Sequence, residues 1–407
     1  MDYAVFDESM KNDYTILVPT MLPIHFELII SVLKKYGYKV EQLTNCDPEI
    51  REYGLKYVHN DICYPAQVVI GQLLYAIEHG NYDTHKIALM ITQTGGGCRA
   101  SNYISLLRKA LSNAGYGYIP VISLNPGGLD GQSLKLNLPM IKGMLYGVLI
   151  GDLIMTLRNQ TLPYQTEKVT DEVTRKLIEE IKPVLCDKNF KYKEIKDIYL
   201  KVIDAFENIP KSEKKVKRVG VVGEIYVKFS SLGNNELEKF LMDNDCEVVM
   251  GGLFDFCMYC IYNAVADYKL YGIGRIKAFF SNILYRALLK KQKDVINLIN
   301  ENSRFEAPTY FDDTKKLIRG YIGIGVKMGE GWLLTAEILE LIEKGVKNIV
   351  CAQPFGCLPN HIVGKGMIKN IKEHYPDVNI VSVDYDASAS KVNQENRIKL
   401  MMNSERI

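Results

Sequence analysis

The stretch ITQTGGGCRASNY, residues 91–103, joins two different patterns in this chain. Before it lies an apolar run at 86–91 that predicts a strand. After it, apolar residues recur at the spacing of one helix face, at Ile104, Leu107 and Leu111. The stretch therefore predicts a strand-to-helix turn, and the rest of the chain is interpreted outward from this turn.

The turn combines flexible backbone with a reactive side chain. Gly95, Gly96 and Gly97 allow positive φ angles and close approach of a neighbouring group, because they carry no Cβ. Cys98 follows them at the expected start of a helix. Unpaired N–H groups and the positive end of the helix dipole favour a thiolate there. We therefore expect Cys98 to be a ligand or a nucleophile, with the three glycines around the bound group.

The residues on either side of this turn predict an α/β domain over 1–130. Strands are expected at 14–18, 39–43, 86–91 and 118–124, with helices between them. Cys63 stands in the polar stretch YVHNDICYPA, just before a helix that runs to His79. Both Cys63 and Cys98 then lie at the carboxyl edge of the sheet, where open α/β sheets bind their ligands.

The second half predicts a helical region followed by another α/β domain. Residues 131–212 show helical periodicity, and a charged break at 211–218 marks the junction. Residues 213–407 return to alternating strands and helices, with a strand expected over Val219–Phe229 and a helical insertion over 256–302. Cys357 follows a strand and precedes a helix expected over His361–Glu373, so its position matches that of Cys63 and Cys98.

Composition limits the class of protein. The 407 residues are 47% hydrophobic and 24% charged, with a net charge of +2, as in ordinary globular proteins. This balance indicates neither a nucleic-acid-binding nor a membrane-binding surface. The first fifteen residues lack a signal-peptide pattern, and the apolar run Met144–Gly151 is too short to span a bilayer. We expect a cytoplasmic protein.

Nine cysteines without secretory features do not indicate a disulfide framework. Six of them are expected to be structural, including the CxxC pair Cys257 and Cys260, which falls on an expected helix. The remaining three occupy equivalent strand-to-helix turns: Cys63, Cys98 and Cys357.

Three such thiols could form a zinc site, a catalytic cysteine site or an iron–sulfur cluster site. Zinc would take the three thiolates with His59 or His361, although structural zinc usually uses close cysteine pairs. A single catalytic cysteine would need His59 or His25 as its base, and no nucleophile motif surrounds any of the three. An iron–sulfur cluster fits better, because its thiolates come from several directions and glycine-rich turns offer N–H groups to its sulfurs.

Four strings of this sequence carry a resemblance that covers nearly the whole chain. They resemble the bacterial acyl-CoA dehydratase activase-related proteins. These are distantly similar to the iron–sulfur subunits of 2-hydroxyacyl-CoA dehydratases and to double-cubane cluster proteins. The strings are HNDICYPAQVVIGQL, ITQTGGGCRASNYISLLRKAL, GEGWLLTAEILELI and CAQPFGCLPNHIVGKGMIK.

The resemblance implies a fold, a cofactor and a partner. The fold would be two Rossmann-like parallel-sheet domains with a helical connecting region. A 4Fe-4S or double-cubane cluster would lie between the domains, bound by Cys63, Cys98 and Cys357. A separate ATP-hydrolysing activase would supply a low-potential electron, which the dehydratases pass to a thioester carbonyl to expel a hydroxyl group.

This sequence differs from the longer relatives, because it has no Walker A run and no convincing paired phosphate loops. The activase would therefore be a separate protein. The substrate does not follow from the resemblance, and an acyl-CoA is one of several small molecules to consider. The enzyme classes indicated are a lyase or an ATP-coupled reductase component; a non-catalytic cluster carrier and a zinc-binding α/β enzyme remain alternatives. A homodimer is also expected.

Polar residues near the cysteines are candidates for substrate binding or for hydrogen bonds to sulfur, with turn and capping roles equally open. These residues are Gln93, Thr94, Arg99, Asn102 and Asn360. Asn393 and Arg397, four apart on the last expected helix, indicate a solvated face.

Overall fold

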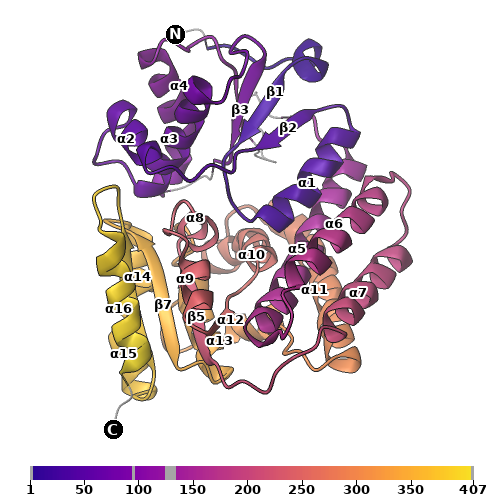
Figure 1. Ribbon diagram of the computed structural model, residues 1–407, viewed down its shortest axis with the longest axis vertical. Helices are drawn as coiled ribbons and strands as arrows, with labels where there is room; N and C mark the ends of the chain where they lie inside the picture. The colour runs from indigo at the N-terminus through magenta and orange to yellow at the C-terminus, as the bar shows by residue number, and fades with distance from the viewer. Residues whose placement is uncertain (1–2, 94–96, 124–133, 405–407) are drawn as a thin grey trace.

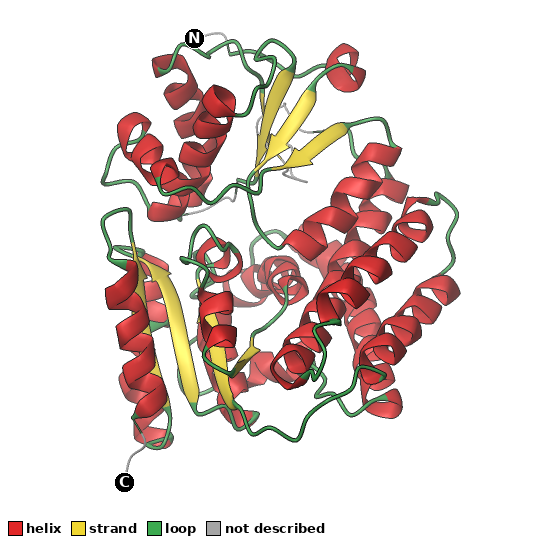
Figure 2. Cartoon of the chain, in the orientation of Figure 1, coloured by secondary structure: helices red, strands yellow, loops and turns green. Residues whose placement is uncertain are grey.

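The computed structural model describes residues 3–93, 97–123 and 134–404, and it shows a mixed α/β chain with two four-stranded parallel sheets (Figures 1 and 2). This confirms the prediction of an α/β chain with parallel sheets. In Figure 1 the first sheet occupies the upper part of the molecule and the second the lower left, with a group of helices at the right.

The first sheet has the strand order β2-β1-β3-β4. Helices α1 and α4 connect neighbouring parallel strands, while α2 and α3 connect β2 to β3 across β1. Four of them frame the sheet: α1 (Pro23–Lys35), α2 (Glu49–Tyr57), α3 (Tyr64–His79) and α4 (Tyr103–Asn113). The strands are β1 (Thr15–Val18), β2 (Lys39–Gln42), β3 (Ile87–Ile91) and β4 (Val121–Ser123). The predicted end of the fourth strand, Leu124, lies outside the described residues.

Both faces of the first sheet are buried at its inner strands β1 and β3, whereas the edge strand β2 alternates exposed and buried residues. Successive side chains of a strand point to opposite faces. Ile16 and Met90 therefore pack with helices α1 and α5, while Leu17 and Leu89 pack with α3 and α4. This explains the continuous apolar run of β3, all five residues of which are buried.

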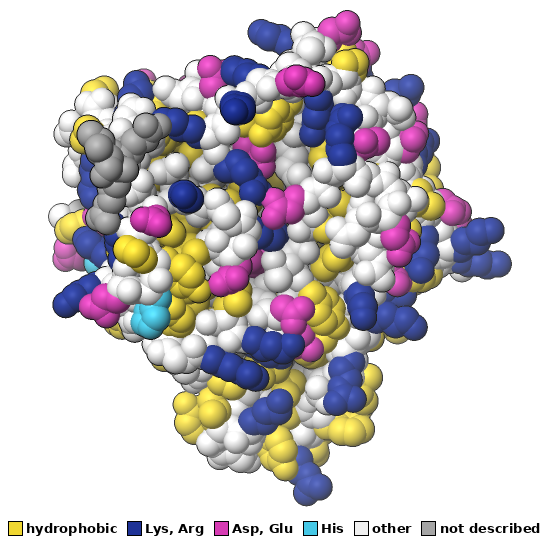
Figure 3. All heavy atoms as spheres, turned by 90° about the horizontal axis from the view of Figure 1, so that it is seen from below, with side chains coloured by type: hydrophobic (Ala, Val, Ile, Leu, Met, Phe, Trp, Pro, Cys, Tyr) yellow, Lys and Arg dark blue, Asp and Glu magenta, His cyan; other side chains and the backbone are white. Residues whose placement is uncertain are grey.

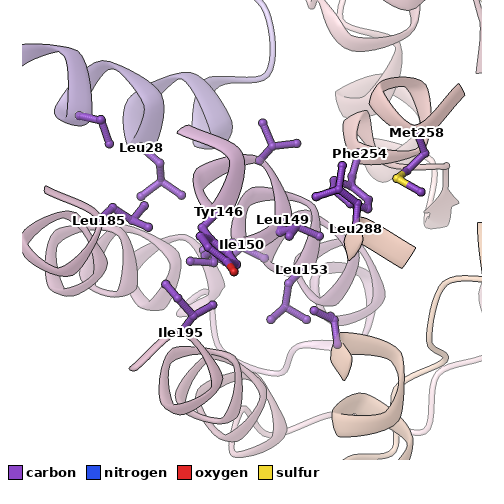
Figure 4. Packing of buried hydrophobic residues seen from close by; sticks show 14 of the residues in the cluster. Leu28, Tyr146, Leu149, Ile150, Leu153, Leu185, Ile195, Phe254, Met258 and Leu288 are labelled. Atoms are coloured by element: carbon purple, nitrogen blue, oxygen red, sulfur yellow. The ribbon is translucent and has the colours of Figure 1, made fainter. Parts of the chain in front are cut away.

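The helical region consists of α5 (Leu138–Thr161), α6 (Thr170–Cys186) and α7 (Tyr192–Glu207), which pack beside α1 (Figure 1). Among the described residues, one helical stretch, Leu138–Tyr164, is long and apolar enough to cross a bilayer, and 61% of its most apolar window is buried inside the molecule. This stretch includes the shorter run Met144–Gly151. Figure 4 shows the reason for the burial: Tyr146, Ile150 and Leu153 of α5 point into a cluster with side chains of the surrounding helices.

The second sheet repeats the order of the first as β6-β5-β7-β8. One face packs on α9 and α16, and the other on α13 and α15. The strands are β5 (Lys217–Gly223), β6 (Cys246–Val249), β7 (Asn348–Pro354) and β8 (Asn379–Tyr385). The helices are α8 (Ile225–Phe229), α9 (Leu237–Asp243), α10 (Leu253–Tyr271), α11 (Arg275–Asn302), α12 (Phe311–Leu317), α13 (Trp332–Glu343), α14 (Leu358–Val363), α15 (Ile368–His374) and α16 (Lys391–Asn403).

Two predicted elements of the second half are wrong in their extent. The strand expected over Val219–Phe229 ends at Gly223, whose φ of +152° brings it so close to β7 that a Cβ would lie 1.9 Å from the Ala352 carbonyl oxygen. A short helix, α8, follows at once. The helix expected over His361–Glu373 is divided into α14 and α15 around Gly364. Helix α2 was not predicted.

The carboxylate of Asp152 on α5 connects three helices. Its Oδ1 lies 2.7 Å from Nε2 of His25 on α1 and accepts from the Leu253 N–H at 2.8 Å. Its Oδ2 accepts from the Phe254 N–H, also at 2.8 Å. Because Leu253 and Phe254 begin α10, Asp152 supplies the partners that N–H groups at a helix start lack within their own helix. Asp152 thus joins the first-sheet side of the molecule to the second.

We expect Asp152→Ala to lower the free energy of unfolding by about 3 kcal/mol, because it leaves buried N–H groups and His25 without their acceptor. Asp171→Ala is the matched control. Asp171 is 74% exposed in its surface ion pair with Arg158, and its loss should cost less than about 1 kcal/mol. Urea unfolding measures both values. Equal unfolding free energies for the two variants would contradict the role given to Asp152.

Candidate thiol-lined site

Cys63 lies directly before α3, where a polar turn meets the helix. It is partly buried, and its Sγ lies 3.0 Å from the hydroxyl oxygen of Tyr103. Pro65 stands in the first turn of α3, where a missing N–H is tolerated. Because Tyr103 begins α4, this contact brings the turn of Cys63 to the start of the helix that follows Cys98.

Cys98 lies between β3 and the short helix η2 (Arg99–Asn102), as the sequence predicts. The preceding Gly97 donates its N–H to Sδ of Met328 at 3.1 Å. A Cβ on Gly97 would lie 3.3 Å from the same sulfur, so the glycine allows this close approach. Gly95 and Gly96, also predicted to surround the bound group, lie outside the described residues.

Cys357 follows β7 and directly precedes α14, which has Pro359 in its first turn. Nδ2 of Asn360 lies 3.5 Å from the Cys357 sulfur and also donates to Oε2 of Glu330 at 3.0 Å. Asn360 is fully buried, and its Oδ1 has no hydrogen-bond partner among the residues that the structure describes. This geometry agrees with the predicted hydrogen bond from Asn360 to sulfur.

Two carboxylates lie beside the thiols. Glu330 is 7% exposed, and its Oε1 accepts from the N–H of Ile225 at 3.0 Å. Glu224 precedes α8, and its Oε2 accepts from the N–H of Val227 at 2.8 Å. The loop before α13 and the start of α8 thus bring both acids to the carboxyl end of β5, next to β7.

A series of contacts connects the three cysteine turns. Cys63 contacts Tyr103 at the start of α4, which follows Cys98; Gly97 then contacts Met328. Two residues further along the chain, Glu330 accepts from Asn360, which also contacts Cys357. The three thiols are close enough to interact electrostatically, since a charge on Cys98 raises the pKa of Cys63 and of Cys357. The fold therefore brings together residues 63, 98 and 357.

The thiols are protonated at neutral pH in the metal-free chain. Burial raises the pKa of Cys63 to about 11, and it raises the pKa of Cys98 and of Cys357 as well. The N–H groups at the helix starts lower these values by less than burial raises them. The expectation that the helix N-terminus favours a thiolate is therefore wrong for the metal-free chain. A bound cation would supply the missing stabilisation, with release of the thiol protons.

The acid pair also favours its protonated form. Burial, and then the neighbouring Glu330, raise the pKa of Glu224. Burial likewise raises the pKa of Glu330, against the opposing effect of the hydrogen bonds it accepts. Two close carboxylates cannot both ionise cheaply, so the pair retains a proton above the usual titration range of glutamate.

The polar residues predicted around the turn have mostly structural positions. Gln93 accepts from the Ile104 N–H at 3.1 Å and so caps α4. Arg99 and Asn102 are exposed, and Thr94 lies outside the described residues. Exposed positions for residues 393 and 397 confirm the predicted solvated face of α16.

The histidines considered as ligands or bases lie elsewhere or are engaged. His59 is 70% exposed and pairs with Asp61 at 3.3 Å. His25 is 1% exposed and contacts Asp152. Nδ1 of His361 lies 2.8 Å from the Cys357 carbonyl oxygen. Among the residues that the structure describes, no three His, Cys, Asp or Glu side chains are close enough to hold a single metal ion.

The remaining cysteines are free thiols in the described chain. Cys351 is fully buried in β7, which confirms its predicted core position. Cys257 and Cys260 lie one turn apart on α10, and burial raises the pKa of each to about 12. Cys260 is also close enough to Glu330 for the carboxylate to raise its pKa further. Cys260 is therefore a neighbour of the acid pair, which the sequence did not indicate.

Sequence reasoning missed four residues of this site: Tyr103, Glu224, Met328 and Glu330. The signal for Glu224 was its place directly after the apolar strand β5. The signal for Glu330 was its place between two glycines before an apolar helix, since Gly329 and Gly331 have φ of +58° and +48°. Both acids follow turns that only glycine forms readily.

Comparisons with known proteins give no identification: no protein-family model matches the chain, and no curated protein matches it.

The acid pair predicts a pH dependence of stability. Because the folded pKa of Glu330 lies above the unfolded value of about 4.3, the folded chain binds more protons and loses stability as pH rises toward the folded pKa. In metal-free protein, Glu330→Gln should reduce the loss of stability between about pH 5 and pH 8, because glutamine carries no titrating proton. Urea unfolding at both pH values tests this, with exposed Glu373→Gln as control. An unchanged loss in the Glu330 variant would contradict the proton assignment.

Proposed function

We propose that this chain is the iron–sulfur component of an ATP-dependent low-potential reductase or 2-hydroxyacyl-CoA dehydratase-like system. The observation that carries the proposal is the series of contacts that joins the turns of Cys63, Cys98 and Cys357. Three thiols from turns far apart in sequence meet where loops from both sheets come together, with two acids beside them.

The chemistry of the donors fits a polynuclear cluster. A single zinc ion with Zn–S bonds of about 2.3 Å needs its thiolates within roughly 4 Å of one another. The described residues offer no group of three donors that tight. In a cluster each thiolate binds a different iron, so the thiolates are spaced more widely. The partly buried, protonated thiols also fit ligands that ionise on metal binding better than a free nucleophile.

The fold supports the same proposal. Each sheet has the strand order found in doubly wound nucleotide-binding folds, with the first strand of each half in the interior. We infer two Rossmann-like domains, 1–130 and 213–407, joined by the helical region 131–212, with the cluster between them. Such folds bind ligands at the carboxyl ends of their strands, where Cys98 and Cys357 lie.

In this proposal the side chains have distinct tasks. Cys63, Cys98 and Cys357 hold the cluster, a 4Fe-4S or double-cubane centre that supplies a low-potential electron when bound. Asn360 donates a hydrogen bond to the Cys357 sulfur, and bonds of this kind tune the potential of a bound metal. The Glu224–Glu330 pair holds a proton beside the thiols, so a substrate there meets a proton donor. This proton favours chemistry over a purely carrying role.

The chain would act with partners. A separate ATP-hydrolysing activase would deliver the electron, since no Walker A run is present in the sequence. A cytoplasmic location, an anaerobic setting, a small-molecule substrate such as an acyl-CoA, and a homodimer all accompany the proposal.

Anaerobic reconstitution with iron and sulfide tests the ligands. Wild-type protein should bind several irons per chain together with acid-labile sulfide and show the brown absorption of a cluster. Cys63→Ser, Cys98→Ser and Cys357→Ser should each lose most of the iron, because each removes one of three anchors.

Cys257→Ser and Cys260→Ser are the matched controls and should retain wild-type iron. Thermal unfolding of the metal-free variants separates ligand loss from misfolding. Zinc without sulfide, or iron loss only in the Cys257 and Cys260 variants, would contradict the proposed site. A cluster whose spectrum does not respond to reductant or to any acyl-CoA tested would favour the carrier alternative.

A further inference from the structure

The α10–α11 hairpin exposes an apolar stripe that none of the described residues covers. Helix α11 buries one face against the molecule through Ala278, Tyr285 and Leu288. The opposite face repeats apolar residues at i, i+3, i+4, i+7 and i+8, the spacing of a second helix face. These residues are 47–76% exposed: Ile276, Phe279, Phe280, Ile283 and Leu284.

The tip and the end of α10 continue the stripe. Gly272 and Gly274, with φ of +70° and +72°, form the turn, and Ile273 between them is 65% exposed. Tyr268 and Tyr271 on the last turn of α10 are 41% and 58% exposed. Isolated exposed apolar side chains are ordinary, but a contiguous set on one hairpin indicates a binding surface.

The stretch of sequence that carries the stripe is basic. Residues 268–293 contain seven Lys or Arg and no Asp or Glu. On the helix, Arg275 and Arg286 lie on one side of the stripe and Lys277 on the other. Figure 3 shows hydrophobic side chains beside dark blue Lys and Arg side chains over the lower part of the face that it presents. The net charge of the whole chain is only +2, because acidic residues elsewhere offset this local excess of cations. The net charge therefore gave no indication of a membrane-binding surface.

We propose that the α10–α11 hairpin binds the surface of an anionic lipid bilayer. The stripe of Phe and Ile would enter the acyl boundary, the two tyrosines would lie at the headgroup level, and the cations would contact lipid phosphates. A second copy of the chain fits less well, because a two-fold contact through this face would bring its cations against each other. A partner protein with both charges on its surface would not explain why 26 successive residues of the hairpin contain no Asp or Glu. The proposal is independent of the iron–sulfur assignment.

Sedimentation with sucrose-loaded vesicles tests the proposal. Full-length protein should bind vesicles of equal parts phosphatidylglycerol and phosphatidylcholine, bind phosphatidylcholine alone weakly, and dissociate as salt is raised. Phe279→Ser with Phe280→Ser should weaken binding roughly tenfold or more, through loss of apolar insertion. Arg275→Glu with Lys277→Glu should weaken it about as much and abolish the preference for the anionic lipid.

Matched controls carry the same kinds of change elsewhere. Val392→Ser with Leu400→Ser removes two exposed apolar side chains from α16, and Lys168→Glu with Arg175→Glu reverses two exposed charges. Both should bind as the wild type does, and circular dichroism should show all variants folded. The proposal is overturned if the wild type does not bind anionic vesicles, or if the hairpin variants bind as well as the controls. A self-association that the Phe279 and Phe280 changes abolish, without vesicle binding, would make the stripe a protein interface instead.

Discussion

The carboxylate of Asp152 is the point on which the arrangement of the molecule depends. It satisfies the first N–H groups of α10 and at the same time contacts His25 on α1, so one side chain of α5 fixes helices from both halves. The apolar cluster of Figure 4 packs the same helices together, through Leu28 of α1, Leu149 of α5 and Phe254 of α10. With these helices in place, the two sheets direct loops from their carboxyl ends toward one another. The meeting of the three cysteine turns follows from this arrangement.

Burial has opposite consequences for the site with and without a metal. It keeps the thiols and the acid pair protonated in the metal-free chain, because a charge with little water around it is costly. A bound cation reverses this cost for the thiols, so metal binding and proton release are coupled. In the proposed cluster site the acids would not serve as ligands and would keep their proton. The same desolvation would then prepare sulfur ligands and an adjacent proton donor.

The sequence predicted the parts of the fold that depend on local pattern. Continuous apolar strands such as β3 and the turns around Cys98 and Cys357 were recognised because strand, glycine or proline, and helix follow one another within a few residues. The strand-to-helix turn predicted at Cys63 is wrong, because α2 precedes it and the turn joins two helices. The predicted strand Val219–Phe229 was too long. The real strand ends at Gly223, where the backbone approaches β7, a segment that is distant in sequence. Glu330 and Met328 were not predicted as site residues for a similar reason. Their roles arise from contacts with Asn360 and Gly97, which are distant in sequence. Contacts between distant segments leave no periodic trace in a sequence.

The central claim is that three distant thiols bind one metal centre. Crystals of anaerobically reconstituted protein, measured on both sides of the iron absorption edge, test it most directly. The account predicts one anomalous density feature of several irons, in bonding contact with the sulfurs of Cys63, Cys98 and Cys357. Anomalous density at a different set of cysteines, or a single ion at only one of these three, would contradict it.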